Sequence, residues 1–322
     1  MNRSLLSIDN LAVHFETPDG PARAVDNISL NIHAGETLGL VGESGCGKSL
    51  TALSILRLLP AAARMSAGEI TFKNDNLADF TDAGMRHIRG REIAMIFQEP
   101  MTSLNPVMPI GFQVAEPLIT HQKLPKADAY SQAAEWLEYV RIPAAGKRLN
   151  DYPHQLSGGM RQRVMIAMAM VCRPLLLIAD EPTTALDVTI QAQILALMRR
   201  LKETQQMALL LISHDLSIIA QMANRVAVMY AGQVVEISPV KQLFDRPLHP
   251  YTQGLLRSIP LPGTVEKRLF EISGTVPRLT DMIRGCKFSE RCIQAQKRCY
   301  DEKPELLNIG DGRKVRCWLG QN

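Results

Sequence analysis

The sequence lacks long hydrophobic runs: none of its apolar stretches reaches the ~18 residues that a membrane-spanning helix requires. The longest, near residues 208–212, has the length of a strand in a protein core. The start of the chain also lacks the apolar segment of a signal peptide. We therefore expect a cytoplasmic protein, which would meet a membrane only at its cytoplasmic face.

An excess of charge is missing as well, because 36 basic and 32 acidic residues leave a net charge of only +4. This balance does not favour a polyanionic partner, so we expect no binding of nucleic acid. Internal repeats and low-complexity tracts are also missing. With 322 residues, 46% of them hydrophobic, the chain is long enough for one large globular domain and a smaller one.

Short apolar stretches alternate with helix-like stretches through most of the chain. Strands are predicted at residues 24–33, 37–41, 92–97, 175–179, 208–212 and 225–230, and helices at residues 50–59, 110–142 (interrupted at Pro117 and Pro125), 159–172, 188–204 and 215–223. This alternation is typical of an α/β fold with a parallel sheet. It weakens after Leu243, where five prolines fall between Pro247 and Pro277, so we place a domain boundary near residues 245–265.

A glycine-rich loop follows the strand predicted at residues 37–41. Residues 42–49, GESGCGKS, have the spacing of a phosphate-binding loop. Glycines let backbone N–H groups curl around phosphates, Lys48 would reach the β- and γ-phosphates, and the Ser49 hydroxyl would ligate Mg²⁺. Because an apolar strand precedes the loop and an apolar-periodic helix follows it, the motif predicts nucleotide binding.

Two carboxylates, Asp180 and Glu181, follow the apolar run at residues 175–179. Ligands of parallel α/β sheets bind at the carboxyl ends of the strands, where these side chains would lie. Asp180 is the candidate for holding Mg²⁺, directly or through water, and Glu181 is the candidate for polarising an attacking water. The alternative, a pair of solvated carboxylates that cap the next helix, is disfavoured by the phosphate loop upstream.

Four further motifs occur in a fixed order around these two. They are Gln98 after the apolar strand EIAMIF, the segment LSGGMRQ at residues 156–162, the segment ALD at residues 185–187, and the segment SHD at residues 213–215. Together they resemble the ATP-binding-cassette (ABC) ATPases over about residues 5–245. The resemblance implies an α/β phosphate-loop NTPase cassette with a parallel sheet core, an antiparallel β subdomain and a helical subdomain at about residues 100–172.

The resemblance also implies roles for individual residues. The catalytic set is Glu181, His214, Gln98 and Lys48. The nucleotide contacts are Phe15 under the adenine, Gly42, Ser44, Gly45, Gly47, Lys48, Ser49, Leu50, Gln98, Asp180 and Asp187, with Ser157, Gly158 and Gly159 serving the ATP held by a partner cassette. The Mg²⁺ ligands are Ser49, Gln98 and Asp180.

Three segments narrow the resemblance to the ATPases of dipeptide and oligopeptide importers, and to their D-type subunit. They are EPMTSLNP after Gln98, YPHQ at residues 152–155 and HPYTQ at residues 249–253. Relatives of these importers also take up nickel complexes, glutathione or antimicrobial peptides, so these cargoes stay open. The resemblance implies a second, non-identical cassette, two transmembrane permease subunits and an extracytoplasmic binding protein as partners, with the chain peripheral on the cytoplasmic face of the inner membrane.

Four of the six cysteines lie in the last part of the chain: Cys286, Cys292, Cys299 and Cys317. The spacing is wider than the two to four residues usual in zinc sites, which favours an iron–sulfur cluster over zinc. Importers of this family carry a [4Fe–4S] cluster on a similar tail, although Glu290 and Ile293 replace prolines of the family pattern. We therefore expect a small Cys-rich C-terminal domain at residues 246–322, after a cassette at residues 1–245.

Three rival functions remain to be weighed. A soluble cassette ATPase acting on ribosomes or DNA commonly has two cassettes in one chain or a coiled-coil insertion, and this sequence has neither. A regulatory cassette without turnover often lacks the glutamate or the signature segment, which here is LSGGMRQ at residues 156–162, whereas Glu181 and residues 157–159 are present. An exporter is often fused to membrane helices, which are missing here.

Overall fold

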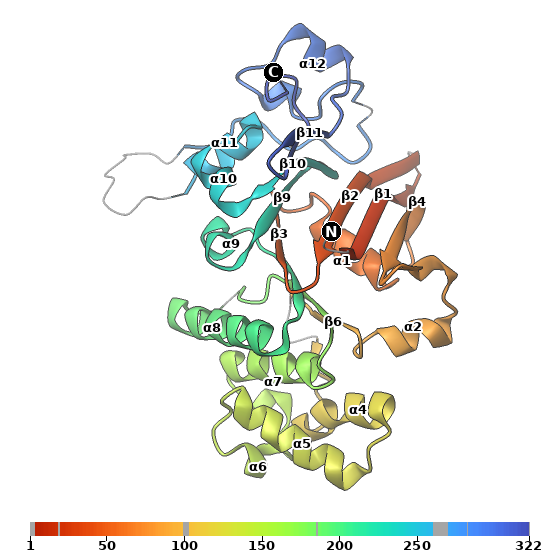
Figure 1. Ribbon diagram of the computed structural model, residues 1–322, viewed down its shortest axis with the longest axis vertical. Coiled ribbons are helices and arrows are strands. Elements are labelled where there is room, and N and C mark those ends of the chain that lie inside the picture. The colour runs from red at the N-terminus through yellow and green to blue at the C-terminus, as the bar shows by residue number, and fades with distance from the viewer. Residues whose placement is uncertain are drawn as a thin grey trace. The chain divides into compact units, whose positions relative to one another are not determined.

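The computed structural model describes residues 4–18, 20–98, 103–184, 186–259, 270–281 and 283–321. These residues form two compact units, which Figure 1 draws in one chain. The first unit contains residues 33–36 and the described part of 79–211; the second contains the described parts of 4–32, 37–78 and 212–322.

An antiparallel sheet forms one part of the second unit, where strands β2, β1 and β4 lie side by side (Figure 1). Its strands, in spatial order, are β2 (Gly20–His33), β1 (Ser4–Thr17), β4 (Ala63–Phe72) and β5 (Asp75–Asn76). Leu6, Ile8, Leu11 and Val13 of β1 are buried. The strand predicted at residues 24–33 is confirmed as part of β2, and the sheet is the antiparallel β subdomain.

The second unit also holds a run of neighbouring strands around the phosphate loop. In spatial order they are β11 (Leu307–Gly310), β12 (Arg313–Val315), β10 (Gln233–Pro239), β9 (Arg225–Tyr230) and β3 (Thr37–Val41). β3 and β9 are parallel, with Leu38 opposite Arg225 and Val41 opposite Val228. Every residue of β3 is buried, which is why the strand reads as a continuous apolar run. The strands predicted at residues 37–41 and 225–230 are confirmed with their bounds.

The helices of the second unit are short. They are α1 (Lys48–Ile55), α9 (Leu216–Met222), α10 (Val240–Asp245), α11 (Pro250–Arg257), α12 (Lys297–Asp301) and the 3-10 turn η3 (Ser289–Arg291). α1 ends before the predicted residue 59, because Arg57 adopts a left-handed conformation with φ 52° that no helix continues through.

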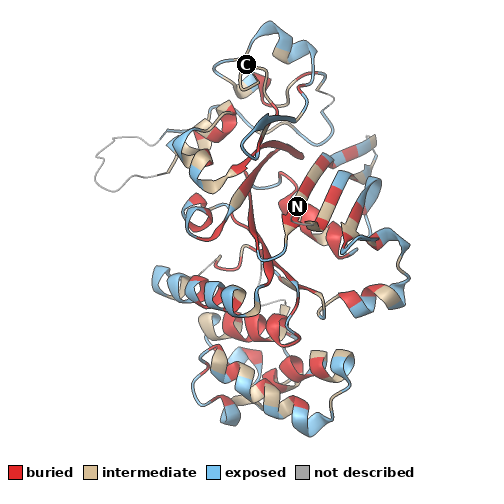
Figure 2. Ribbon diagram, in the orientation of Figure 1, coloured by how far each residue is buried: buried red, intermediate tan, exposed pale blue. Residues whose placement is uncertain are grey.

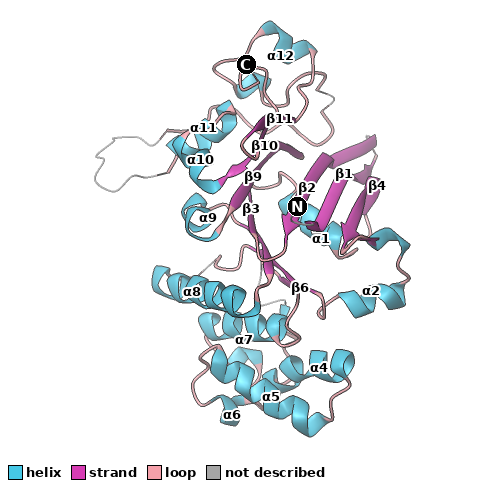
Figure 3. Cartoon of the chain, viewed as in Figure 1, coloured by secondary structure: helices cyan, strands magenta, loops and turns pink. Residues whose placement is uncertain are grey.

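The first unit combines three strands with a group of helices (Figure 3). Its strand order is β8 (Ala208–Ile212), β7 (Leu176–Asp180) and β6 (Ile93–Ile96), and β6 and β7 are parallel. Its helices are α2 (Asp82–Ile88), α4 (Ile110–Gln122), α5 (Lys126–Tyr139), α6 (Ala145–Arg148), α7 (Gly158–Met170) and α8 (Val188–Gln205), with the 3-10 turns η1 (Leu77–Asp79), at the junction of the two units, and η2 (Pro153–Gln155). α4, α5 and α7 pack against one another, and the buried residues of α7 are red in Figure 2.

Proline acts differently at the two predicted interruptions of the 110–142 region. Pro125 is the N-cap of α5, so the predicted break is confirmed there. Pro117 lies inside α4, where the predicted break is wrong. Val114 and Leu118 on either side of it are fully buried, and this packing stabilises the helix against the loss of one backbone hydrogen bond. Among the described residues, no helix is both long enough and apolar enough to cross a membrane.

Candidate nucleotide-binding and catalytic site

The phosphate loop, Gly42–Ser49, connects β3 to α1 and has a shape that only glycine allows at two positions. Gly47 is the N-cap of α1 with φ 100°, and a Cβ there would lie 2.5 Å from the carbonyl oxygen of Ala24. A Cβ on Gly42 would collide with the carbonyl oxygen of Met229. The loop therefore curls tightly at the carboxyl end of a buried parallel strand, as a phosphate cradle must.

Lys48 lies inside this curl. Its Nζ donates hydrogen bonds to the carbonyl oxygens of Gly42, at 2.8 Å, and Glu43, at 3.0 Å, and the residue is only 6% exposed. Ser49 is half-buried in the first turn of α1. The loop thus gathers an ammonium group, a hydroxyl and the free N–H groups of a helix start, which together are suited to a polyphosphate.

The other predicted residues of the second unit vary in exposure. Ser44 and Gly45 are exposed on the loop, and Leu50 is half-buried in α1. Phe15 is half-buried on β1, opposite Ala63 of β4. His214 is exposed and lies between β8 and α9, directly before the N-cap Asp215.

In the first unit, Asp180 is the last residue of β7 and is 4% exposed. Glu181 follows it with φ 47°, a left-handed conformation that is uncommon for a residue with a side chain and that clusters at functional sites. Gln98 Nε2 donates to Glu181 Oε2 at 3.1 Å, so the structure brings these two predicted residues together. Thr184 Oγ1 donates to the same oxygen at 2.9 Å.

Thr184 was missed by sequence reasoning. The signal that could have found it is its spacing, since a hydroxyl three residues after a turn carboxylate is well placed to bond back to it. The backbone supports this turn as well, because the Thr184 N–H donates to the Glu181 carbonyl at 3.2 Å. Gln98 and Thr184 therefore both orient the carboxylate of Glu181.

The signature segment begins α7 as predicted. Ser157 is the N-cap, and its Oγ accepts the Met160 N–H at 3.3 Å. A Cβ on Gly159 would lie 2.9 Å from the side chain of Ile190, whose own N–H donates to Oδ1 of the α8 N-cap Asp187. The starts of α7 and α8 thus meet, whereas the space beside Gly158 is open.

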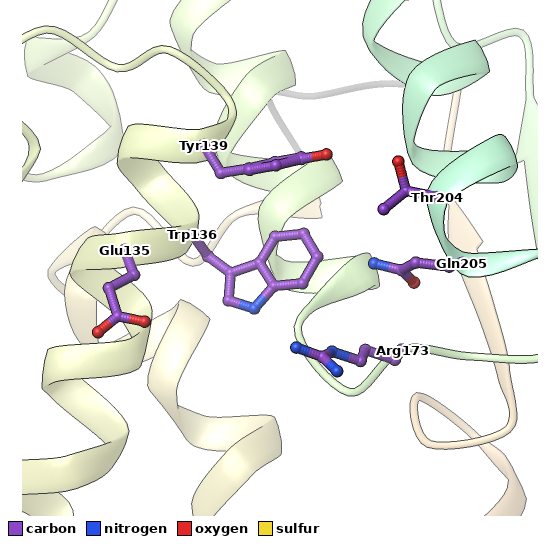
Figure 4. A pocket seen from close by; sticks show the side chains of 6 residues that line it. All are labelled: Glu135, Trp136, Tyr139, Arg173, Thr204 and Gln205. Atoms are coloured by element: carbon purple, nitrogen blue, oxygen red, sulfur yellow. The ribbon is translucent and has the colours of Figure 1, made fainter.

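A cavity of about 470 Å³ lies elsewhere in the first unit (Figure 4). The side chains that line it are Glu135, Trp136, Tyr139, Arg173, Thr204 and Gln205. In Figure 4 the two rings extend from α5 toward Thr204 and Gln205 at the end of α8. None of these residues belongs to a predicted motif, so this cavity is not the predicted nucleotide site.

The predicted iron–sulfur cluster is wrong, and so is its zinc alternative. Cys286, Cys292, Cys299 and Cys317 line one small cavity of about 20 Å³, close to the space that one water molecule needs. In the part of the chain that the structure describes, no group of three or more His, Cys, Asp or Glu side chains is placed to hold a metal ion. The names of the relatives described below are those of transport ATP-binding proteins and mention no cluster. The four cysteines are free thiols.

Comparison with known proteins agrees with the motifs. Residues 25–184 match the family described as ABC transporter, and residues 235–299 match the family described as oligopeptide/dipeptide transporter, C-terminal region. A probable peptide ABC transporter ATP-binding protein of Sinorhizobium fredii is 50% identical over 316 residues, which are 98% of this chain and 94% of that protein. The dipeptide transport ATP-binding protein DppD of Escherichia coli is 48% identical over 314 residues, 98% of this chain and 96% of that protein.

Solved structures agree with the fold. A dimeric ATP-binding cassette bound to ADP and phosphate has a TM-score of 0.66 at 27% identity, covering 73% of this chain and 98% of the solved one. The predicted α/β cassette is therefore confirmed. Because near-full-length relatives about half identical are named as ATP-binding proteins of peptide or dipeptide transport, the chain belongs to the ABC transporter family, among the ATP-hydrolysing subunits that carry the oligopeptide/dipeptide transporter C-terminal region.

Proposed function

We propose that this chain is the ATP-hydrolysing motor subunit of an importer of di- and oligopeptides. The observation that carries the proposal is the identity of 48% to 50%, over 98% of the chain, to proteins named for peptide or dipeptide transport. The phosphate loop and the Gln98–Glu181 pair supply the chemistry that such a motor needs. Residues 1–245 form the cassette, and residues 246–322 form a small C-terminal extension that contains the four cysteines.

ATP binding begins at the phosphate loop. Lys48 exchanges its bonds to the loop carbonyls for bonds to the β- and γ-phosphates, and the N–H groups of Gly45 and Gly47 donate to phosphate oxygens. Ser44 and Leu50 contribute N–H groups beside them. Phe15 stacks under the adenine, and Asp187 completes the contacts at the cassette interface.

Mg²⁺ fits the residues present. The predicted ligands all carry the oxygen donors that Mg²⁺ prefers: the hydroxyl of Ser49 in the second unit, and the amide oxygen of Gln98 and the buried carboxylate of Asp180 in the first. The ion would neutralise charge that develops on the phosphate oxygens. Asp180 lies at the carboxyl end of β7, the end at which parallel sheets hold their ligands.

Glu181 acts as the general base of hydrolysis. Its carboxylate takes the proton of the attacking water, while Gln98 and Thr184 hold its orientation by hydrogen bonds of 3.1 and 2.9 Å. His214 contacts the γ-phosphate, and Lys48 stabilises the charge spread over the transferred group.

A partner cassette completes the site. Ser157, Gly158 and Gly159 begin α7, where a hydroxyl, N–H groups and the positive helix end are suited to an anion. These groups serve the γ-phosphate held by the second cassette, and the second cassette serves the ATP held here. The partner is non-identical, and both contact two permease subunits that receive cargo from an extracytoplasmic binding protein. The chain is accordingly peripheral, at the cytoplasmic face of the membrane.

Reconstitution tests the proposal. We expect the chain, purified with its permease subunits and placed in vesicles, to import a mixture of di- and oligopeptides only with MgATP inside and binding protein outside. Replacing Lys48 with Ala removes the phosphate contact and should abolish ATP hydrolysis and uptake together. Uptake of nickel complexes or glutathione without peptide uptake would exclude the peptide assignment but retain the motor role. ATP-independent peptide uptake would exclude the motor role itself.

A further inference from the structure

One residue of the phosphate loop, Glu43, is held by the C-terminal extension, residues 246–322, which is called the C-terminal region below. Its carboxylate oxygens both accept hydrogen bonds from Nη1 of Arg291 at 3.1 Å. Its N–H donates to the hydroxyl oxygen of Tyr251 in α11 at 3.0 Å. Its carbonyl oxygen accepts from Nζ of Lys48 at 3.0 Å. Glu43 therefore links two residues of the C-terminal region to the lysine that meets the phosphates.

The guanidinium group of Arg291 is fixed in orientation. Nε donates to the carbonyl oxygen of Ser273 at 3.1 Å, and Nη2 donates to that of Ile272 at 3.2 Å. These bonds leave Nη1 directed at Glu43 and at the hydroxyl of Tyr230, 3.3 Å away. The side chain of Arg291 is only 8% exposed, so its charge is screened little by solvent. The planar fork of arginine suits this geometry, which lysine could not reproduce.

Three buried aromatic rings support the contact. The centroid of Tyr230 lies 4.7 Å from that of Tyr251 and 5.1 Å from that of Phe288, and the Cζ atom of Arg291 lies 5.6 Å from the Tyr230 centroid. All three rings are at most 3% exposed. Tyr230 ends β9, whereas Tyr251 and Phe288 belong to the C-terminal region. The packing of these rings holds the C-terminal region rigidly beside the phosphate loop.

A second contact reaches the loop from the C-terminal region through the turn between β9 and β10. Nζ of Lys287 donates to the carbonyl oxygen of Ala231 at 2.8 Å and pairs with the carboxylate of Asp26 at 3.0 Å. The next residue in the turn, Gly232, donates its N–H to the carbonyl oxygen of Cys46 in the phosphate loop at 3.1 Å. The loop is thus supported on two sides by residues that bond to the C-terminal region.

We propose that Arg291 is a positioning residue that sets the shape of the phosphate loop through Glu43, so that the C-terminal region tunes the affinity for ATP. Loop N–H groups bind phosphates only in one arrangement, and the N–H, carbonyl and side chain of Glu43 are all engaged. Loss of one partner also leaves a partly buried charge without its counter-charge. The inference rests on the proposed ATP site.

A double-mutant cycle on the full-length chain tests it. Dissociation constants for MgATP, with KM and kcat, are measured for the wild type, Arg291→Gln, Glu43→Gln and the double variant. We expect each single variant to raise the dissociation constant and KM about tenfold, with a smaller effect on kcat. The double variant should be no worse than either single one, because both remove the same contact. Arg291→Lys should recover part of the affinity, since it keeps the charge without the fork.

Arg284→Gln, which changes an exposed arginine of the same segment, is the matched control and should bind ATP like the wild type. Melting temperatures show which variants are folded; if Arg291→Gln is not, Glu43→Gln decides alone. A folded Glu43→Gln with wild-type affinity, or losses that simply add in the double variant, would overturn the inference. Failure of the wild type to bind ATP would instead overturn the proposed function.

Discussion

At the scale of single residues, Glu181 combines a left-handed backbone with a carboxylate held by Gln98 and Thr184. Both donors hold the same carboxylate oxygen in one orientation, which suits a general base. We expect Glu181→Gln to bind ATP with wild-type affinity but to hydrolyse it about 10²- to 10⁴-fold more slowly. Phosphate release in a single turnover, with the amount of ATP that stays bound, measures both effects.

Two further variants serve as a control and as an intermediate case for the Glu181→Gln result. Glu135→Gln changes an exposed glutamate of α5 and should hydrolyse ATP at the wild-type rate. Thr184→Val keeps the base but removes a donor that orients it, so its rate should lie between those of the wild type and Glu181→Gln. Near-wild-type turnover by Glu181→Gln would show that another group accepts the proton.

The residues of the site were predictable wherever local spacing carries the chemistry. Gly42, Lys48 and Ser49 occur within eight residues, and the Asp180–Glu181 pair directly follows an apolar run. The contact between Glu43 and Arg291 was not predictable, because 248 residues separate its partners and neither belongs to a motif with that meaning. Which residues meet at such distances depends on the packing of whole elements.

At the scale of elements, His249 joins α11 to the strands beside it. Its Nδ1 accepts the Tyr251 N–H at the start of the helix, and its own N–H donates to Glu236 of β10. Burial lowers the pKa of His249 to about 3, and the positive charge of Arg316 nearby acts in the same direction. A histidine in the unfolded chain has a pKa of about 6.5. Between these values the unfolded chain binds a proton that the folded chain excludes, so stability falls as pH falls.

From this window we expect acidification from pH 7 to pH 5 to reduce the free energy of unfolding by about 2 kcal/mol through this residue alone. Urea unfolding at both pH values measures the reduction. His249→Asn keeps an acceptor for the Tyr251 N–H and should show a pH dependence smaller by that amount. His154→Asn, at an exposed histidine, should behave like the wild type. Equal pH dependence in all three proteins would contradict the assignment.

The elements were predictable from sequence to the degree that burial leaves a pattern. β8 is a continuous apolar run, β3 and β9 are apolar after their first residues Thr37 and Arg225, and the predicted bounds of all three match. β11 is exposed at every residue, so no alternation of apolar and polar residues in the sequence predicts this strand. Pairing with β12, which in turn pairs with β10, is what makes it a strand.

At the scale of the whole molecule, the start of α7 indicates whether hydrolysis needs a second cassette. Ser157 caps the helix, and Gly158 has open space beside it. Both residues are predicted to contact an ATP that another cassette holds. Hydrolysis should therefore depend on assembly, even though the phosphate loop and Glu181 are both in this chain. A substitution in the signature segment separates ATP binding by this chain from hydrolysis in the assembled pair, because it leaves this chain's own phosphate loop intact.

We expect Ser157→Arg, made in this chain alone within the purified complex, to retain ATP at its own loop with an affinity close to that of the wild type. Hydrolysis of the ATP held by the partner cassette should fall at least tenfold, because an oxyanion donor is lost and a bulky cation enters the interface. Photo-labelling with an azido-ATP reports occupancy of each cassette, and phosphate release reports turnover. Ser131→Arg, at an exposed serine of α5, adds the same charge outside the signature and should leave both unchanged. Unchanged turnover in Ser157→Arg would show that each cassette hydrolyses its ATP without the other.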